Sequence, residues 1–303
     1  MRAYVTGAGG FVGRHVADAL RAAGAEVRTD RAELLDPDAV SKAVGGCEVV
    51  VHVAARYRYD GPDDLIERVN VDGTRNVIEA CVRHGVRRLV HTSTAGTCGP
   101  VPGRPATEDD APPPWELTIP YKASKLTAER LVASAARDGL DAVIVNPTTP
   151  VGPGDEKPTP TGRMIAGVAR GRVRAFIAGT GLNVVDVRDV ARGHVLALER
   201  GRRGERYLLG GIDLDLERVF ALVAAAAGRP APRIRIPYAL PRALAALRLL
   251  NRHEVLLARA PMFFSSEKAR RELGYAPGPV EPAIAAAVEE ELARSHRRAQ
   301  RLP

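Results

Sequence analysis

The sequence predicts an α/β fold: a doubly wound parallel sheet followed by a smaller C-terminal region. Over the first half of the chain, short apolar segments alternate with amphipathic segments, which is the order expected of repeated strand–helix–strand units. The strand segments are apolar nearly throughout, as in Val49-Val50-Val51, and such runs are typical of strands that are covered on both faces. With 303 residues, the chain can form one large core or two smaller ones.

The first strand, turn and helix carry three regularly spaced glycines. The apolar strand Ala3–Val5 is followed by Gly7, Gly10 and Gly13, and then by a helical pattern. Gly7 permits a tight turn, Gly10 leaves room for a pyrophosphate, and Gly13 lets the helix pack closely on the sheet. The helix N-terminus offers free N–H groups to the phosphates. The pattern therefore predicts a dinucleotide-binding sheet of the Rossmann type.

The second strand, expected over Glu26–Thr29, ends at two residues that point to different cofactors. An acidic residue about 20 residues beyond the glycines commonly holds the adenosine ribose 2′-hydroxyl of NAD, and Asp30 fits this role. Arg31 fits contact with the 2′-phosphate of NADP. Because a carboxylate repels a phosphate dianion, we favour NAD slightly. Both residues also fit an exposed turn.

A short helix and a third strand come next. Asp36, followed by proline, is expected to cap the helix. The third strand is expected over Glu48–Ala55, where the small side chains of Ala54 and Ala55 let a cofactor lie close to the backbone. We interpret His52 as a packed strand residue rather than a catalyst.

A loop with Tyr57 and Tyr59 follows, and these side chains fit either the lining of a substrate cleft or an exposed loop. A long helix is expected from Asp63 to His84. Its polar residue Asn70 is expected to bond neighbouring backbone groups, as buried polar residues usually do. The fourth strand is expected over Arg87–His91.

Hydroxyl side chains follow the fourth strand, in the run Thr92-Ser93-Thr94. Open α/β sheets bind their ligands at the carboxyl ends of the strands. Ser93 and Thr94 can therefore bond a substrate oxygen at this edge.

Tyr121 and Lys125 form a Y-x-x-x-K spacing at the start of a helix expected from Tyr121 to Asp138. This spacing places both side chains on one face of the helix. A phenol with a pKa near 10 is a poor acid–base group at neutral pH, and a nearby ammonium is expected to lower that pKa. Lys125 can also bond the nicotinamide ribose. Tyr121 is then expected to exchange a proton with a substrate oxygen while hydride moves to or from the nicotinamide.

A further strand over Asp141–Val145 completes the expected sheet, and the character of the chain changes past Thr149. We assign residues 1–149 to the dinucleotide-binding domain, with later segments returning to it, and residues 150–303 mainly to a substrate-binding domain and tail. In that second part we expect the strands Val173–Ala178 and Tyr207–Leu209 and the helices Val190–Leu198, Leu216–Ala227 and Leu240–Leu250.

Composition excludes several classes of protein. No apolar run approaches the length of about 18 residues that a membrane span needs. The start lacks a secretory signal pattern, and the three cysteines lack metal or disulfide spacing, so we expect a reduced, cytoplasmic protein. Aromatic residues make up 4% of the chain, which argues against nucleic-acid binding. The net charge of +8 fits a phosphorylated substrate, and the basic run Arg294–Arg301 fits a solvated tail.

The glycine form G-x-x-G-x-x-G resembles that of extended short-chain dehydrogenases/reductases. A closer resemblance, covering about residues 1–280, is to the hopanoid-associated sugar epimerase family, which is related to dihydroflavonol reductases and UDP-galactose epimerases. It rests on segments that include Asn146–Pro153, Lys157–Arg163, Gly181–Val187, Leu196–Gly201, Gly204–Tyr207 and Met262–Ser266.

The resemblance implies a catalytic pair, Tyr121 and Lys125. The Thr-Ser-x-Ala-Gly-Thr pattern of dihydroflavonol reductases implies Thr94 as the catalytic hydroxyl, with Ser93 as the alternative. The family resemblance also implies a homodimer formed through the helices at 63–84 and 121–138. The implied cofactor contacts are Gly7, Gly10, Phe11, Val12, Gly13, Ala54, Ala55, Thr92 and Pro147. Ser93, Tyr121 and Lys125 are expected to contact the cofactor as well.

Two departures limit what the resemblance implies. The stretch between Val27 and Asp36 is shorter than in that family and resembles the compact turn of dTDP-4-dehydrorhamnose reductases, so the preference for NAD or NADP is not carried over. Sugar 4,6-dehydratases have an Asp-Glu pair just after the catalytic threonine. Ala95-Gly96 stands at that place here, which disfavours dehydration of that type.

The expected function is NAD(P)-dependent oxidation, reduction or epimerisation at a secondary hydroxyl or ketone of a sugar-like or polyol substrate, with nucleotide sugars among the candidates. An epimerase returns the hydride and a reductase releases the cofactor, and the same residues serve both. The alternatives are a ketoreductase of a non-sugar natural-product intermediate, an enzyme of non-redox cyclisation or elimination, and a non-catalytic NAD(P) sensor. Candidate substrate contacts in the second part are Lys157, Arg163, Asn183 and Arg188.

Overall fold

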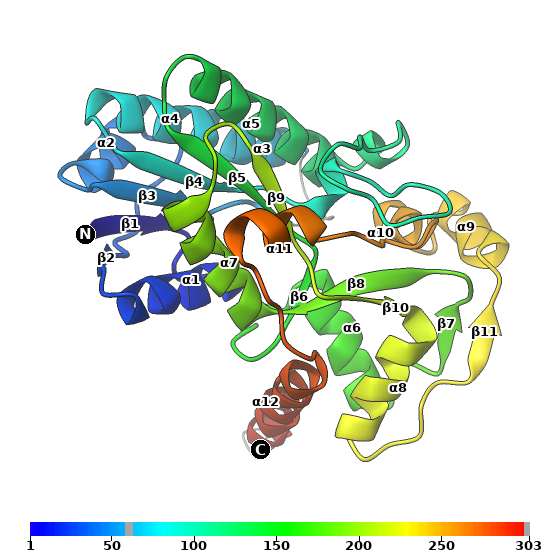
Figure 1. Cartoon of the computed structure of the whole chain (residues 1–303). Helices are drawn as coiled ribbons and strands as arrows, with labels where there is room; N and C mark the ends of the chain where they lie inside the picture. Colours follow the sequence, from blue (N-terminus) through cyan, green and yellow to red (C-terminus); the bar gives the residue numbers. More distant parts are fainter. Residues whose placement is uncertain (58–62, 300–303) are drawn as a thin grey trace.

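A computed structural model describes residues 1–57 and 63–299, so Tyr59 lies outside the described residues. Its main sheet has six parallel strands in the order β2-β1-β3-β4-β5-β9 (Figure 1). The order reverses at β1 and β3, which is where open α/β sheets bind ligands. The predicted doubly wound sheet is confirmed. Its strands are β1 (Arg2–Thr6), β2 (Glu26–Arg28), β3 (Val49–His52), β4 (Arg88–Thr92), β5 (Ala142–Pro147) and β9 (Arg206–Leu209).

Helices cover both faces of this sheet (Figure 1). On one face α1 (Phe11–Ala22) packs against α7 (Val187–Arg200), and the buried Leu20 joins their core. On the other face α2 and α4 pack together, and α5 packs beside α4. Asp36 caps α2 as predicted, because its carboxylate accepts bonds from the N–H groups of Asp38 and Ala39. The helices of the second face are α2 (Pro37–Val44), α4 (Gly73–Arg83) and α5 (Pro120–Arg137).

The helix expected over 63–84 is interrupted. It consists of α3 (Asp63–Glu67), a π-helical turn η1 (Arg68–Asp72) and α4. A π-helical turn changes the helical period, which an apolar pattern with a regular spacing does not reveal. The turn contains Asn70, whose side chain is buried.

The C-terminal part contains two small sheets, β10-β8-β6 and β11-β7, with α6, α8 and α12 packed in a third core (Figure 1). The expected helix 240–250 is wrong in its length, because Arg248 takes a left-handed conformation (φ 60°) and a second helix begins after it. The elements are β6 (Thr149–Val151), α6 (Pro160–Ala169), β7 (Ala175–Ile177), β8 (Gly181–Asp186), β10 (Ile212–Asp215), α8 (Leu216–Ala226), β11 (Ile234–Ile236), α9 (Ala239–Ala246), α10 (Arg252–Leu257), α11 (Glu267–Leu273) and α12 (Glu281–Ala299).

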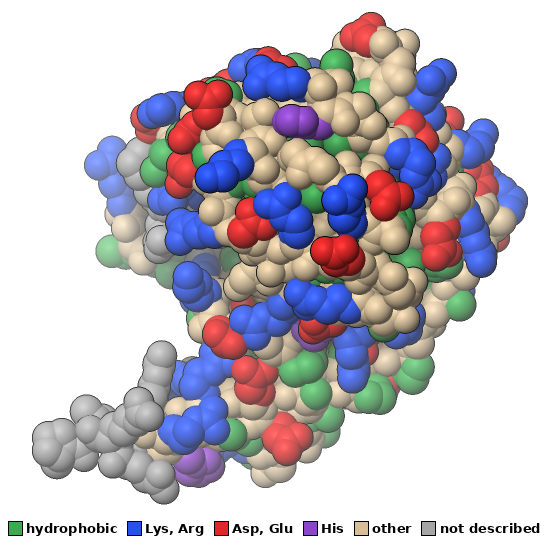
Figure 2. Space-filling view, turned by 90° about the vertical axis from the view of Figure 1, so that its left-hand side faces the viewer, with side chains coloured by type: hydrophobic (Ala, Val, Ile, Leu, Met, Phe, Trp, Pro, Cys, Tyr) green, Lys and Arg blue, Asp and Glu red, His purple; other side chains and the backbone are tan. Residues whose placement is uncertain are grey.

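Segments beyond residue 186 join the main sheet and its covering helices. Strand β9 pairs with β5, α7 lies on α1, and α11 contacts both α7 and β9. Across residues 1–57 and 63–299, no helix is both long and apolar enough to cross a membrane. The face shown in Figure 2 carries intermixed basic and acidic side chains.

The contact between α1 and the glycine turn is testable by a pair of substitutions. A Cβ on Gly13 would lie 2.1 Å from the carbonyl oxygen of Gly7, whereas a Cβ on Gly9 would meet no atom within 4 Å. We expect Gly13→Ala to lower the free energy of unfolding by about 1–3 kcal/mol, because the backbone has to move. Gly9→Ala, the matched control, is expected to leave it nearly unchanged. Equal stability of both variants in urea unfolding would contradict the close packing.

Candidate active site

The glycine turn has the shape expected of a pyrophosphate site. Gly7 has φ 70°, and a Cβ there would lie 2.7 Å from the Cα of Ala54, so the end of β3 packs directly on the turn. Gly10 caps α1 through its backbone, without a side-chain cap, and its N–H donates to Gly7 at 2.9 Å. The space around Gly9 is open. The uncapped helix start and this open space fit a dinucleotide. Phe11, Val12 and Gly13 form the first turn of α1.

A buried hydrogen-bond chain leads away from this turn. The Thr6 hydroxyl accepts from the N–H groups of Val53 and Ala54 and donates to Nδ1 of His52 at 2.8 Å. The other ring nitrogen of His52 bonds the hydroxyl of Thr74 at 3.1 Å, which in turn donates to the carbonyl of Asn70. Burial lowers the pKa of His52 to about 3, so the ring is neutral. His52 is therefore a packed residue, as predicted.

The same chain reaches the helix that carries Tyr121. The Asn70 amide accepts from the N–H of Arg56 at 2.7 Å and donates to Oγ of Ser124 at 2.9 Å. Ser124 donates to the backbone carbonyl of Tyr121 at 2.8 Å. The expected bonding of Asn70 to backbone is confirmed. The contact with Ser124 joins the π-helical turn to α5. No local sequence pattern predicts it, because the two residues are far apart in the chain.

Tyr121 and Lys125 lie on α5 as predicted, but their electrostatics differ from the expectation. Burial raises the pKa of Tyr121, and the neighbouring Tyr57, whose ring centroid lies 4.5 Å away, adds to the shift. The Lys125 ammonium donates to the carbonyl of Thr92 at 2.6 Å, and burial lowers the pKa of Lys125 to about 8. The pKa of Tyr121 is therefore raised and not lowered as expected, because burial of the phenol and the neighbouring Tyr57 both disfavour the phenolate.

The predicted hydroxyl groups lie at the carboxyl end of β4. Thr94 begins the short turn η2 (Ala95–Thr97), and its Oγ1 accepts from the N–H of Gly96 at 3.3 Å. The Ser93 hydroxyl is buried and has no hydrogen-bond partner among the described residues, and the same holds for Thr148 beyond β5. Buried hydroxyls without partners are rare, so these two fit contact with a bound ligand. Sequence reasoning had not assigned a role to Thr148.

The other predicted cofactor residues have mixed surroundings. The Thr92 hydroxyl bonds Nε2 of His194 on α7 at 2.9 Å, whereas the Thr92 carbonyl accepts from Lys125 of α5. Pro147 is buried at the end of β5. Ala55 is exposed beyond β3. The hydroxyl of Thr92, a residue expected to contact the cofactor, is thus already bonded within the protein.

Asp30 and Arg31 are both exposed just beyond β2. The Asp30 carboxylate forms an ion pair with Arg28, with Nη2 3.1 Å from Oδ2, and the hydroxyl of Tyr4 donates to the Asp30 carbonyl at 3.1 Å. Asp30 therefore lies between Arg28 and Arg31 in the sequence, and Arg28 is its ion-pair partner. Arg28 was not among the predicted residues.

A second buried network fixes η2 against α5. Glu129 of α5 accepts from the Thr97 hydroxyl at 2.8 Å and from the Asn146 amide at 2.8 Å. Its other oxygen pairs with Arg206 of β9 at 2.9 Å. Four separate segments meet at this carboxylate, so it positions the turn that carries Thr94.

Three of the four candidate substrate contacts have hydrogen bonds or ion pairs within the protein. Asn183 is buried, and its amide donates to Asp213 at 2.7 Å and accepts from the N–H of Gly211. The Arg188 guanidinium is paired with Asp186. Lys157 and Arg163 are exposed, and Arg163 donates to the carbonyl of Pro158 at 3.3 Å. We therefore interpret Asn183 as a structural residue.

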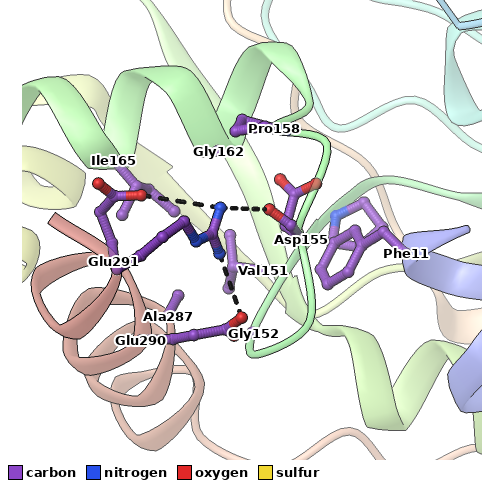
Figure 3. Close-up of a pocket in the computed structure, with 12 residues that line it drawn as sticks. Phe11, Val151, Gly152, Asp155, Pro158, Gly162, Ile165, Ala287, Glu290 and Glu291 are labelled. Carbon is purple, nitrogen blue, oxygen red and sulfur yellow. Dashed lines mark hydrogen bonds and ion pairs between the residues drawn. The ribbon is translucent and has the colours of Figure 1, made fainter. Parts of the chain in front are cut away.

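A pocket lies between α1, α6 and α12 (Figure 3). The ring of Phe11 and the carboxylate of Asp155 face it from the α1 side, and Glu290 and Glu291 face it from α12 (Figure 3). Arg294 crosses it, donating to the Asp155 carbonyl at 3.2 Å and to Glu290 at 3.1 Å. The bond to Asp155 holds the loop after β6 against α12. The pocket is a junction of charged groups, and its lining includes no predicted catalytic residue.

Comparison with known proteins identifies the family. A model of the NAD dependent epimerase/dehydratase family matches residues 3–210. The chain belongs to this family. It is an extended short-chain dehydrogenase/reductase that uses NAD(P), as the resemblance implied.

Similar proteins of this family have different activities. The chain is 34% identical to sterol demethylase protein B of Methylococcus capsulatus, over 95% of this chain and 97% of the relative. It is 33% identical to a 2-alkyl-3-oxoalkanoate reductase of Stenotrophomonas maltophilia, over 91% and 95% of the two chains. The structure of PA4631, a nucleoside-diphosphate-sugar epimerase from Pseudomonas aeruginosa, matches with a TM-score of 0.83 and 28% identity, over 98% and 99% of the chains.

The buried His91 gives a pH-dependent prediction. Its ring lies 5.3 Å from that of His52, and neither ring nitrogen has a hydrogen-bond partner within the described ranges. Burial lowers the pKa of His91, and the charge of Lys125 lowers it further. An unfolded histidine binds a proton near pH 6.5, so stability is lost as the pH falls through that value.

We therefore expect His91→Leu to be at least as stable as the wild type at neutral pH, since a buried unsatisfied polar group costs about 1–3 kcal/mol. Its advantage should grow as the pH falls below about 6.5. Urea unfolding at neutral and acidic pH measures this, with His296→Gln as the exposed control. An unchanged pH dependence in His91→Leu would contradict the prediction.

Proposed function

We propose that this enzyme transfers hydride between NAD(P) and a ketone or secondary alcohol, with Tyr121 as the acid–base group. The observation that supports this most directly is the bond from Lys125 to the carbonyl of Thr92. It brings the helix that carries Tyr121 to the strand end that carries Ser93 and Thr94. A phenol, an ammonium and two hydroxyls then share one edge of a dinucleotide-binding sheet, which is the set that carbonyl reduction needs.

The surroundings of Tyr121 suit proton donation to a carbonyl oxygen. Because burial raises its pKa, the phenol keeps its proton at neutral pH and can donate it as negative charge develops on the substrate oxygen. The hydroxyls of Thr94 and Ser93 stabilise the same oxygen by hydrogen bonds. The Lys125 ammonium, held at the end of β4, favours the phenolate that remains. When bound, the reduced nicotinamide supplies the hydride.

For the substrate, we favour a ketone that is not a sugar. Two relatives that cover more than 90% of this chain are named a sterol demethylase protein and an oxoalkanoate reductase. Three of the four candidate substrate contacts, Arg163, Asn183 and Arg188, have hydrogen bonds or ion pairs within the protein. A second candidate is epimerisation of a nucleotide sugar, which the likeness to the epimerase PA4631 favours.

Tyr121→Phe tests the proposed chemistry. The variant keeps the ring but loses the proton that is transferred, so we expect kcat to fall about 10²–10⁴-fold while the affinity for nucleotide stays the same. The rate is followed by NAD(P)H absorbance with a 2-alkyl-3-oxoalkanoate or 3-oxosteroid as substrate, and UDP-glucose conversion is assayed in parallel.

The controls separate the alternatives. Arg203→Gln, at an exposed site on another element, should keep the wild-type rate. Turnover of UDP-glucose with NAD retained through denaturation would favour the epimerase. Tight nucleotide binding without turnover of any substrate in the wild type would contradict the enzymatic proposal and favour a sensor.

We also propose that Asp30 holds the adenosine ribose and that NAD is the preferred cofactor. The Arg28 ion pair orients the carboxylate but also offsets part of its charge, so NADP is disfavoured only moderately. Asp30→Ala is expected to weaken NADH binding by about 10- to 150-fold, since a hydrogen bond to a charged group is worth about 1.5–3 kcal/mol.

The same variant should bind NADPH as well as, or better than, the wild type, because the repulsion of the 2′-phosphate is removed. Fluorescence titration with both nucleotides gives the two affinities, and Glu33→Ala in the same exposed stretch is the matched control. If Asp30→Ala weakened the binding of NADH and NADPH equally, the assignment of Asp30 to the ribose would be contradicted.

A further inference from the structure

The segment from Arg229 to Ala260 forms one edge of the C-terminal part. It contains β11, α9 and α10, and these lie together at the right-hand edge of Figure 1, on the opposite side from β1 and β2. We call it the 229–260 segment. Helices α9 and α10 contact each other, and β11 pairs with β7 at the rim of the fold.

Large apolar side chains are exposed along this segment. Five of the ten large apolar side chains that are exposed in the described structure lie within it, although it is about a tenth of the chain. Leu247 and Leu249 are 69% and 68% exposed and flank the left-handed Arg248. Single exposed leucines need no explanation, but five large exposed apolar side chains within about a tenth of the chain point to an interaction surface. The five are Ile234, Leu240, Leu247, Leu249 and Leu250.

The same segment carries most of the net charge of the protein. It holds seven arginines and one carboxylate, Glu254, and so has a net charge of +6 out of the +8 of the whole chain. The face in Figure 2 differs, because basic and acidic side chains are intermixed there. One arginine, Arg235, is paired with Glu217 of α8. The seven are Arg229, Arg233, Arg235, Arg242, Arg248, Arg252 and Arg259.

We propose that the 229–260 segment lies on the surface of an anionic lipid bilayer. Exposed leucines enter the boundary between head groups and acyl chains, and arginines beside them reach the lipid phosphates while their stems stay in apolar surroundings. The alternation of both side-chain types at Leu247, Arg248 and Leu249 suits this arrangement. The excess of positive charge matches the negative surface of such a bilayer.

Two other occupants fit the segment less well. In a symmetric pair of copies the same surface contacts itself, so the arginines of one copy would face those of the other. Single-stranded nucleic acid is held by aromatic side chains between the basic ones, and Tyr238 is the one aromatic residue in the 229–260 segment.

Contact with a bilayer would place the helix of Tyr121 near the lipid. The Arg259 guanidinium lies over the ring of Trp115 at 5.0 Å, and Trp115 precedes Tyr121 by six residues. The 229–260 segment therefore adjoins the stretch that leads into α5. This inference does not rest on the proposed function, since binding to a bilayer is measured without any substrate.

Flotation of the full chain with lipid vesicles tests the proposal. We expect binding to vesicles of phosphatidylcholine mixed with phosphatidylglycerol, little binding to phosphatidylcholine alone, and release at high salt. The double variants Leu247→Ser/Leu249→Ser and Arg242→Gln/Arg248→Gln should each lower the bound fraction by roughly tenfold. Thermal unfolding checks that the variants are folded.

Matched controls come from other exposed sites. Ile212→Ser removes an exposed apolar side chain, and Arg137→Gln/Arg203→Gln removes two exposed charges, so both should bind like the wild type. Equal binding to both kinds of vesicle, no binding to anionic vesicles, or an equal loss in the controls would overturn the proposal. So would a change from dimer to monomer in Leu247→Ser/Leu249→Ser without vesicle binding, because the surface would then join two copies.

Discussion

The buried chain of hydrogen bonds from Thr6 to Ser124 connects the two halves of the candidate active site. It passes through His52, Thr74 and Asn70, and each of these groups is desolvated. Buried polar groups are costly unless they are bonded, so the chain allows few alternative arrangements of β1, β3 and α5. The glycine turn and the helix that carries Tyr121 are thereby held in one geometry.

The parts of the candidate site that the sequence predicts are those encoded locally. The glycines at 7, 10 and 13, the pair Tyr121 and Lys125, and the hydroxyls after β4 each follow from spacing within one strand or one helix turn. The Asn70–Ser124 and Glu129–Arg206 contacts join residues 54 and 77 positions apart. Such contacts depend on how distant segments pack, which a single sequence does not specify.

The difference between local spacing and long-range packing also explains why the pKa expected for Tyr121 differs from that in the structure. The i,i+4 spacing of Tyr121 and Lys125 correctly places both on one helix face, but spacing carries no information on solvent. Lys125 is buried and Tyr121 is half-buried, and removal from water disfavours the charged form of each. The outcome is a neutral phenol beside an easily deprotonated ammonium, where the sequence alone had indicated an activated phenolate.

Strand β9 has a consequence for how the molecule is made. It completes the main sheet beside β5, and α7 covers the face on which α1 lies, yet both come after residue 186. During synthesis, the edge of β5 that pairs with β9 stays unpaired until residues near 209 have left the ribosome. The face that carries α1 likewise stays partly uncovered until α7 has been made. Folding of the first 149 residues is thus tied to the translation of the part that follows, and a fragment cut at that boundary would expose apolar surface.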